Sequence, residues 1–175
     1  MENINLFDIS WEDVLLMGDS AGANLAFATS LKGLYHRTFR VGKLILIYPA
    51  TQTDYSRYTK YNSVIINDGK GFLTRKHLED YINMYIPSIK ERDNKYVNLL
   101  KAKRLFGLPK ILVITGTLDP LHDEGVALVK KLKRHLVSVK HYDLKGATHG
   151  YFTNILDKKY TKQTIEYIKG FVGDY

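Results

Sequence analysis

The chain has 175 residues, of which 45% are hydrophobic and 25% charged, a composition typical of one globular domain with a sizeable core. It contains no cysteine, which excludes disulfides, thiolate metal sites and a cysteine nucleophile. Its net charge is +8, but the basic residues are scattered, so charge alone does not indicate a nucleic-acid-binding protein.

Four short segments predict β-strands, and the first three are apolar without alternation, as in parallel strands that are covered on both faces. They are Val14–Met17, Lys43–Tyr48, Ile111–Thr115 and Ser138–Leu144. Helical periodicity separates or follows them at Ala21–Tyr35, Asp123–Leu136 and Asp157–Val172. Strands that alternate with helices predict an α/β fold, with a mostly parallel sheet of about four strands flanked by helices, in one domain over residues 1–175.

A long segment, Pro49 to Pro109, separates the second and third predicted strands and is rich in tyrosine. Helical spacing predicts a helix at about Thr74–Ile86, which Pro87 ends. A structureless connection of this length is uncommon in a compact domain. We therefore expect residues 49–109 to form helices that overhang one end of the sheet.

No apolar run approaches the ~20 residues that a membrane-spanning helix requires. The N-terminal sequence MENINLFDIS lacks the basic start and the apolar stretch of a signal peptide, which favours a cytoplasmic protein. The densest basic cluster, Lys130–His135, alternates with apolar residues at helical spacing, which is typical of the solvated face of an amphipathic helix. We expect no nucleic-acid partner and no membrane span.

A lone serine lies between two glycines in the stretch Gly18-Asp19-Ser20-Ala21-Gly22, directly after the first predicted strand. A sharp strand-to-helix turn of this kind is strained and crowded, so it requires small residues two positions before and after the serine. The turn exposes the Ser20 hydroxyl at the carboxyl end of the sheet. It also aims the backbone N–H of Ala21 at a developing oxyanion, which makes Ser20 a candidate nucleophile.

The same motif has a structural interpretation. The two glycines would form a tight turn and Ser20 would cap the helix, because serine is a favoured N-cap residue. The motif alone does not distinguish the two interpretations. A serine hydrolase of this type also requires an acid and a histidine, in that order along the chain.

Candidates for both further groups follow later strands. Asp119 lies just after the third predicted strand, and His149 lies in a loop of small residues after the fourth. Because the carboxyl ends of parallel strands meet at one edge of a sheet, we expect both side chains near Ser20. Asp123 is an alternative acid, but it and Glu124 fall in the first turn of a helix, where acidic groups have a natural structural role.

The other histidines are weaker candidates for the base. His122 is too close in sequence to Asp119 to act as an independent base. The remaining four lie in polar or basic surroundings or within a strand, and we expect surface or structural roles for them: His36, His77, His135 and His141.

Four stretches that together span most of the chain carry a resemblance to a known family: GDSAGANLA (18–26), YPAT (48–51), GLPKILVITGTLDPLHDEG (107–125) and THGYF (148–152). They resemble the hormone-sensitive-lipase-like branch of the α/β-hydrolase fold, which contains carboxylesterases, acetyl esterases and lipases. The resemblance implies that Ser20 is the nucleophile, Asp119 the acid and His149 the base, with no metal or cofactor. It also implies that residues 49–109 contribute to a cap and a substrate pocket.

The family pattern includes an HGGG-type loop upstream of the nucleophile, whose backbone N–H groups form the other part of the oxyanion hole. The sequence has no such motif, and nineteen residues precede Ser20. The resemblance thus implies a partial α/β-hydrolase fold that lacks the N-terminal strands. The strand Val14–Met17 would then be a sheet edge, and we expect it to pair with a second copy or with a partner chain.

Three functions fit these observations. The first is a serine carboxylesterase, similar to lipases, that hydrolyses short-chain esters. The second is a catalytically weak or inactive remnant of a hydrolase that lacks the HGGG loop. The third is a related serine hydrolase that acts on peptides or amides, which the stretch LDPLHDEG makes less favoured.

Overall fold

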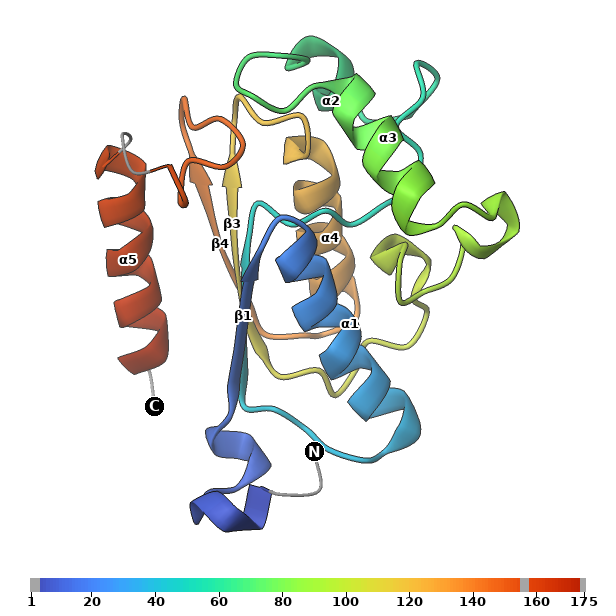
Figure 1. Ribbon diagram of the computed structural model, residues 1–175. Helices are drawn as coiled ribbons and strands as arrows, with labels where there is room; N and C mark the ends of the chain where they lie inside the picture. Colours follow the sequence, from blue (N-terminus) through green and yellow to red (C-terminus); the bar gives the residue numbers. More distant parts are fainter. Residues whose placement is uncertain (1–3, 155–157, 174–175) are drawn as a thin grey trace.

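A computed structural model describes residues 4–154 and 158–173 (Figure 1). It contains a single four-stranded sheet in the order β1-β2-β3-β4, in which every neighbouring pair is parallel. The strands are β1 (Leu15–Asp19), β2 (Lys43–Ile47), β3 (Lys110–Gly116) and β4 (Val139–Leu144). Because the strands are parallel and in sequence order, all four carboxyl ends lie at the same edge of the sheet.

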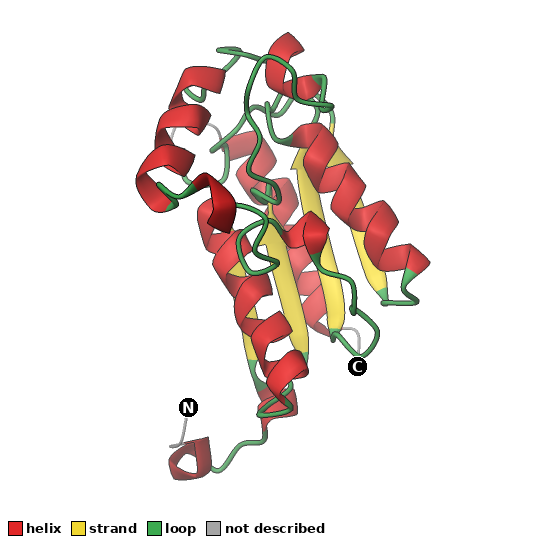
Figure 2. Cartoon of the chain, turned by 90° about the vertical axis from the view of Figure 1, so that its right-hand side faces the viewer, coloured by secondary structure: helices red, strands yellow, loops and turns green. Residues whose placement is uncertain are grey.

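Helices cover both faces of this sheet. α1 (Ala21–His36) and α4 (His122–Arg134) lie on one face, and α5 (Lys158–Gly173) lies on the other (Figures 1 and 2). The remaining short elements are η1 (Ile4–Phe7), η2 (Trp11–Asp13), α2 (Ser63–Ile66), α3 (Arg75–Tyr85), η3 (Ile89–Glu91) and η4 (Leu99–Lys101). Within the described ranges, no helix combines the length and the apolarity needed to cross a bilayer.

This architecture confirms the predicted fold class, and the element bounds shift by only a few residues. The largest shift in a strand is at β1, which continues through Gly18 to Asp19 because these residues still pair with Leu46 and Ile47 of β2. The turn into α1 is therefore only one residue long. The predicted start of the last helix, Asp157, lies outside the described residues.

The two central strands are buried on both faces, which explains why their sequences are apolar without alternation. Leu44 and Leu46 of β2 pack into a cluster with Phe27 of α1, whereas Ile45 and Ile47 pack into a second cluster with residues of α5. Each fully buried side chain of this size contributes ~1.5–3 kcal/mol of burial free energy. The sheet is thus held as a rigid middle layer.

The segment 49–109 divides into two parts with different packing. Its first part, with α2 and α3, forms a small cluster of its own beyond the carboxyl ends of the strands: Tyr55, Val64, Leu73, Leu78, Ile82 and Val97, together with Leu121. Its last part does not overhang the sheet as expected. Leu99, Ala102 and Leu105 recur at a spacing of three and pack into the main core, where η4 contacts both α1 and α4.

β1 is an edge strand in the part of the chain that the structure describes. The main chain at Val14 and at Ser20 faces β2, since Val14 O accepts from Gly42 N–H and Ser20 N–H donates to Ile47 O, each at 2.9 Å. Main-chain groups alternate sides along a strand. The N–H and C=O groups of Leu15, Met17 and Asp19 therefore point outward from the sheet.

Candidate active site

Ser20 alone forms the turn between β1 and α1, and its backbone is strained. Its φ is 52° and its ψ is −119°, a conformation that non-glycine residues rarely adopt. Main-chain hydrogen bonds hold it in place: Ser20 N–H donates to Ile47 O, and Ser20 O accepts from Ala50 N–H at 3.2 Å. Strain of this kind costs ~1–3 kcal/mol and persists only where surrounding contacts enforce it.

The two glycines of the motif do not have the same role. A β-carbon on Gly18 would lie 2.3 Å from the backbone of Gly22 and 2.7 Å from Ala23 N, so the crowding expected at this position is present. A β-carbon on Gly22 would meet only Asp19 Oδ1, at 3.9 Å. Among the described residues, glycine itself is therefore needed at position 18, whereas position 22 has room for a β-carbon.

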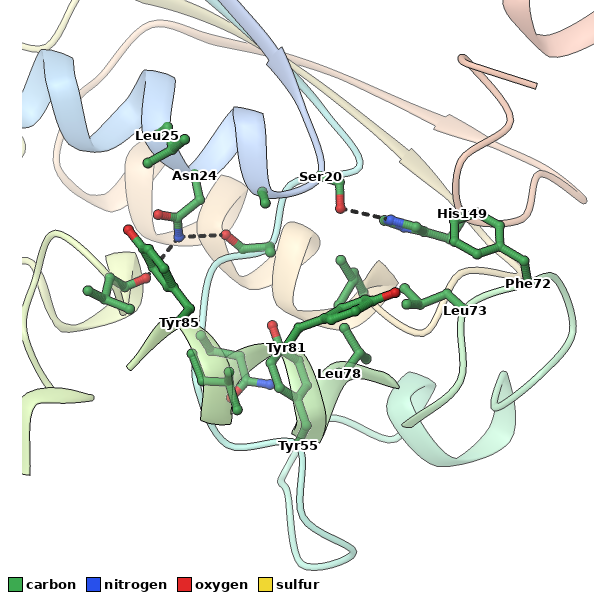
Figure 3. Close-up of a pocket in the computed structure, with 16 residues that line it drawn as sticks. Ser20, Asn24, Leu25, Tyr55, Phe72, Leu73, Leu78, Tyr81, Tyr85 and His149 are labelled. Atoms are coloured by element: carbon green, nitrogen blue, oxygen red, sulfur yellow. Dashed lines mark hydrogen bonds between the residues drawn. The ribbon is translucent and has the colours of Figure 1, made fainter. Parts of the chain in front are cut away.

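The Ser20 hydroxyl contacts a histidine and not the helix. Its Oγ lies 2.9 Å from Nε2 of His149, and it makes no capping hydrogen bond with the backbone of α1 (Figure 3). The alternative interpretation of Ser20 as a helix cap is therefore wrong. The sharp turn instead presents the hydroxyl at the carboxyl edge of the sheet.

His149 is linked in turn to Asp119. Its Nδ1 lies 2.7 Å from Asp119 Oδ2, and both side chains are almost completely buried. Asp119 Oδ1 also accepts from Leu121 N–H at 2.7 Å, and Asn67 donates to the backbone carbonyl of Asp119 at 3.1 Å. These contacts hold the Asp119 carboxylate against the imidazole of His149. Ser20, Asp119 and His149, which follow β1, β3 and β4, thus form one hydrogen-bonded line.

Two aromatic rings pack near the imidazole of His149. The ring centroids of Tyr48 and Phe72 lie 4.8 Å and 5.8 Å, respectively, from the ring centroid of His149. Tyr48 O–H donates to Asp19 Oδ2 at 3.1 Å, so the second residue of the serine motif positions the ring that packs against His149. Burial and the nearby Asp19 carboxylate raise the pKa of Tyr48, so this hydroxyl stays protonated as a donor.

Asp123, the alternative acid, faces a different group. Its carboxylate accepts from Ser63 N–H at 2.9 Å and lies 3.0 Å from Nδ1 of His122. Nε2 of His122 lies 3.1 Å from Asp143. Burial lowers the pKa of His122, but the hydrogen bonds to the two carboxylates more than offset this, so its pKa is raised overall. These residues tie α4 to β4 and α2 and do not reach Ser20.

The Ser20 hydroxyl and His149 open into a cavity of about 390 Å³ beneath α3 (Figure 3). Its lining contains no Lys, Arg, Asp or Glu. The lining is mostly aromatic and aliphatic: Ala21, Leu25, Ala50, Tyr55, Phe72, Leu73, Leu78, Tyr81, Ile82, Tyr85, Val97 and Leu121, with Asn24 and Gln52 as the polar residues besides Ser20 and His149. A neutral, apolar group fits such a cavity.

Ala21, the candidate oxyanion donor, is the first residue of α1 and lines this cavity. The first N–H groups of a helix have no partner within the helix and carry its positive dipole end. Where the structure describes the chain, no group of three or more His, Asp or Glu side chains is arranged to hold a metal ion.

Glu124 is a buried residue that sequence reasoning assigned only to a helix terminus. It is completely buried, and its carboxyl group accepts from Thr51 N–H at 2.6 Å, from Gln52 Nε2 at 3.1 Å and from Tyr55 O–H at 3.3 Å. It therefore holds the wall of the cavity on which Gln52 and Tyr55 lie. The signal was present in the spacing, since Glu124, Leu128 and Leu132 recur every four residues on one face of α4.

Asn24 was also missed as a cavity residue. Its Nδ2 donates to Ala50 O and to Val97 O, each at 2.8 Å, and so joins both ends of the first part of the segment 49–109 to α1 (Figure 3). Its Oδ1 is buried without a hydrogen-bond partner among the described residues. The carbonyl oxygens of Ala50 and Val97 only accept hydrogen bonds, so the NH₂ group of the Asn24 amide must point toward them.

The contrast between the two glycines gives a matched pair of variants. Gly18→Ala forces the first turn of α1 away from β1, and overpacking of this kind typically costs ~1–3 kcal/mol. Gly22→Ala places a methyl group in open space within a helix, where alanine is favoured over glycine by ~1 kcal/mol. Urea unfolding should show a lower midpoint for Gly18→Ala and an unchanged or higher midpoint for Gly22→Ala. Equal shifts would contradict the model of the turn.

The burial of Glu124 predicts that the stability of the folded protein decreases as pH rises. Burial raises the pKa of Glu124 to about 8, and the hydrogen bonds from Thr51 and Gln52 offset only part of this rise. In the unfolded chain the group ionises near its ordinary pKa of 4.5, so the free energy of unfolding falls as pH rises from about 5 to about 8. The slope is at most ~1.4 kcal/mol per pH unit.

The Glu124→Gln variant removes this ionisation. As pH rises from about 5 to about 8, we expect the unsubstituted chain to lose stability relative to Glu124→Gln. Urea titrations at several pH values measure it, and the slope, not the offset at any single pH, carries the information. Parallel stability curves for the two proteins would show that Glu124 titrates normally.

Comparisons with known proteins agree with this fold. A family model described as the alpha/beta hydrolase fold matches residues 2–153. An esterase of Fusarium pseudograminearum is 28% identical over 79% of this chain and 43% of its own length. The gibberellin receptor GID1B of Arabidopsis thaliana is 30% identical over 79% of this chain and 38% of its own length. An arylesterase of Saccharolobus solfataricus is 28% identical over 86% of this chain and 48% of its own length.

Solved structures give the same result. Brefeldin A esterase, a bacterial homologue of human hormone-sensitive lipase, superimposes with a TM-score of 0.85 and 25% identity over 93% of this chain and 48% of its own. An esterase of the archaeon Pyrobaculum calidifontis superimposes with a TM-score of 0.82 and 26% identity over 98% and 57%. The chain thus spans about half the length of the relatives that it matches. It belongs to the alpha/beta hydrolase fold family, in the branch of the hormone-sensitive-lipase-like esterases.

Proposed function

We propose that this chain is a serine carboxylesterase, similar to lipases, that hydrolyses short-chain esters with Ser20, His149 and Asp119 as a catalytic triad. The observation that carries the proposal is the hydrogen-bonded line from Ser20 Oγ to His149 Nε2 and from His149 Nδ1 to Asp119. A serine hydroxyl is a weak nucleophile unless a positioned base accepts its proton, and this line supplies both the base and the group that orients it.

The reaction would proceed in two halves. Ser20 Oγ attacks the ester carbonyl while His149 Nε2 takes the hydroxyl proton, and Asp119 stabilises the imidazolium that forms. The Ala21 N–H, at the start of α1, stabilises the oxyanion. The alcohol leaves with the proton from His149. A water molecule, deprotonated by His149, then attacks the acyl-enzyme and releases the carboxylic acid.

The cavity and the relatives support an ester as substrate. The lining offers no charged side chain to bind a charged substrate, and its surface is mostly apolar. Proteins similar to this chain bear the names acetyl esterase, ethyl acetate hydrolase and arylesterase. In this proposal residues 1–175 act as one partial hydrolase domain, and residues 49–109 contribute its cap and pocket.

A second candidate is a binding protein or a remnant with little catalysis. One of its relatives is named as a receptor, the gibberellin receptor GID1B, and not as a hydrolase. The chain also spans about half of each esterase that it matches. It lacks the HGGG-type loop that adds a second set of oxyanion donors, and the loss of one such donor typically costs ~10²–10³ in rate.

The hydrolysis of p-nitrophenyl acetate and butyrate distinguishes the two candidates. If the triad works, Ser20→Ala should reduce kcat/KM at least ~10³-fold, because the other members act only through the nucleophile. Ser138→Ala is the matched control, since this exposed serine precedes β4 at the opposite end of the sheet. Equal, near-background rates for all three proteins would favour the binding protein or remnant.

We also propose that the outer edge of β1 pairs with another strand, from a second copy or from a partner chain. Unpaired main-chain groups on an apolar edge strand are a template for such pairing. Sedimentation over a dilution series should show concentration-dependent association of the chain. A single monomeric species at all concentrations would exclude pairing with a second copy.

The variant Met17→Pro tests the edge itself. The N–H of Met17 points outward, so proline at this position blocks a new strand but leaves the ladder between β1 and β2 intact. We expect Met17→Pro to reduce association. Ile165→Lys, at an exposed position of α5, is the control and should leave association unchanged. Proline is not used at position 165 because it would break α5.

A further inference from the structure

Phe72 contacts both the cavity and the histidine that we propose as the base. Its side chain lines the cavity, and its ring centroid lies 5.8 Å from that of His149 (Figure 3). The side chain is more than half exposed, so burial in the main core does not hold it in place. Its position beside His149 therefore depends on the packing of its own loop.

The loop of Phe72 packs closely against the loop of His149. A β-carbon on Gly150 would lie 2.3 Å from Cε1 of Phe72, so the phenylalanine ring occupies the space that a side chain at position 150 would need. A β-carbon on Gly71 would lie 3.0 Å from Cβ of Thr148. Gly150 also has a φ of 77°, a conformation that favours glycine. The two loops can approach this closely because positions 71 and 150 carry no side chain.

The segment 67–75, which contains Phe72, also contacts the proposed acid. Asn67 is buried at the start of this segment, and its Nδ2 donates to the backbone carbonyl oxygens of Thr117 and Asp119, each at 3.1 Å. One short stretch of chain thus extends from the backbone of the acid to the ring beside the base. Its position therefore bears on the alignment of both groups with the nucleophile.

The same segment is fixed to α3, beneath which the cavity lies (Figure 3). Asp68 Oδ1 accepts from Arg75 N–H at 2.8 Å, and Thr74 Oγ1 accepts from His77 N–H at 3.1 Å. Both side chains thus bind N–H groups in the first turn of α3, which have no partners within the helix. The helix and the loop of Phe72 are therefore one unit, and a group that fills the cavity beneath α3 contacts both.

We propose that Phe72 is a positioning residue for His149 and that it links the filling of the cavity to the alignment of the base. The inference rests on the proposed function, because it takes His149 as the base of an ester hydrolysis. An acyl group that fills the cavity packs against Phe72 and holds its ring over the imidazole, whereas a small acyl group leaves the ring free to move. Binding energy from the unreactive part of the substrate is then used to align His149 with Ser20, so it raises kcat more than it lowers KM.

Esters of increasing acyl length measure this link. We expect kcat of the unsubstituted chain to rise from p-nitrophenyl acetate to the butyrate and the hexanoate. Phe72→Ala should flatten this rise and lower kcat for the hexanoate about tenfold or more, a larger factor than its effect on KM, because a small misplacement of a catalytic group has a large effect on rate. Phe72→Tyr keeps the aromatic ring and should retain the rise. An unchanged dependence of kcat on acyl length in Phe72→Ala would overturn the proposal.

The matched control is Tyr81→Ala. Tyr81 also lines the cavity and is more than half exposed, but its ring stacks on that of His77, with the centroids 6.1 Å apart. The loss of this ring should raise KM and leave the dependence of kcat on acyl length in place. The same flattening in Tyr81→Ala and Phe72→Ala would show that any large side chain of the lining has this effect, and it would overturn the specific role of Phe72.

A spectroscopic measurement tests the same link without catalysis. The Nδ1–H proton of His149 lies in the hydrogen bond to Asp119, and its NMR resonance is assigned by its absence from His149→Gln. We expect this resonance to be sharp in the unsubstituted chain, in Phe72→Tyr and in Tyr81→Ala, and to be broadened or lost in Phe72→Ala because the imidazole is no longer held. Hexan-1-ol, as a neutral group that fills the cavity, should sharpen it further, and ethanol should not.

The two readouts separate this inference from the proposed function. If no protein hydrolyses the esters but the resonance depends on Phe72 and on hexan-1-ol, the proposed function fails and the positioning role of Phe72 stands. If hydrolysis depends on Ser20 but neither kcat nor the resonance depends on Phe72, the proposed function stands and the positioning role is overturned.

Discussion

The parallel pairing of the four strands is the constraint on which the rest of the structure depends. It places the carboxyl ends of β1, β3 and β4 at one edge of the sheet, so that residues far apart in sequence meet there. The strained turn at Ser20 is enforced by hydrogen bonds from the neighbouring strand and loop. The strain at the turn is offset by the burial of apolar side chains on both faces of β2 and β3.

Buried polar side chains hold the walls of the cavity at this edge. Glu124 fixes the chain that follows β2, and Asn24 joins Ala50 and Val97, near the two ends of the segment that carries α2 and α3, to α1. A polar group without water must find partners inside the protein, so such residues restrict the loops to few conformations. The cavity owes its shape to these contacts as much as to its apolar lining.

Several surfaces around the site have no packing partner among the described residues. The outer edge of β1 has no strand beside it in the described chain, the space beyond Gly22 is open, and the rim of the cavity is apolar and exposed. The relatives of this chain are about twice as long. The hydrogen-bonded line from Ser20 to Asp119 is thus formed completely within the described residues, whereas the surfaces around it are left partly without packing partners.

The sequence by itself determined the fold class, because apolar runs that alternate with helical patterns permit little besides a parallel sheet between helices. It also determined the order serine, acid, histidine and the positions of all three after strands. Only the tertiary structure shows that Asp119, and not Asp123, contacts His149, that Glu124 is buried, and that Leu99–Leu105 pack into the main core. The direction of a side chain depends on which elements pack around it, and a linear pattern contains no such information.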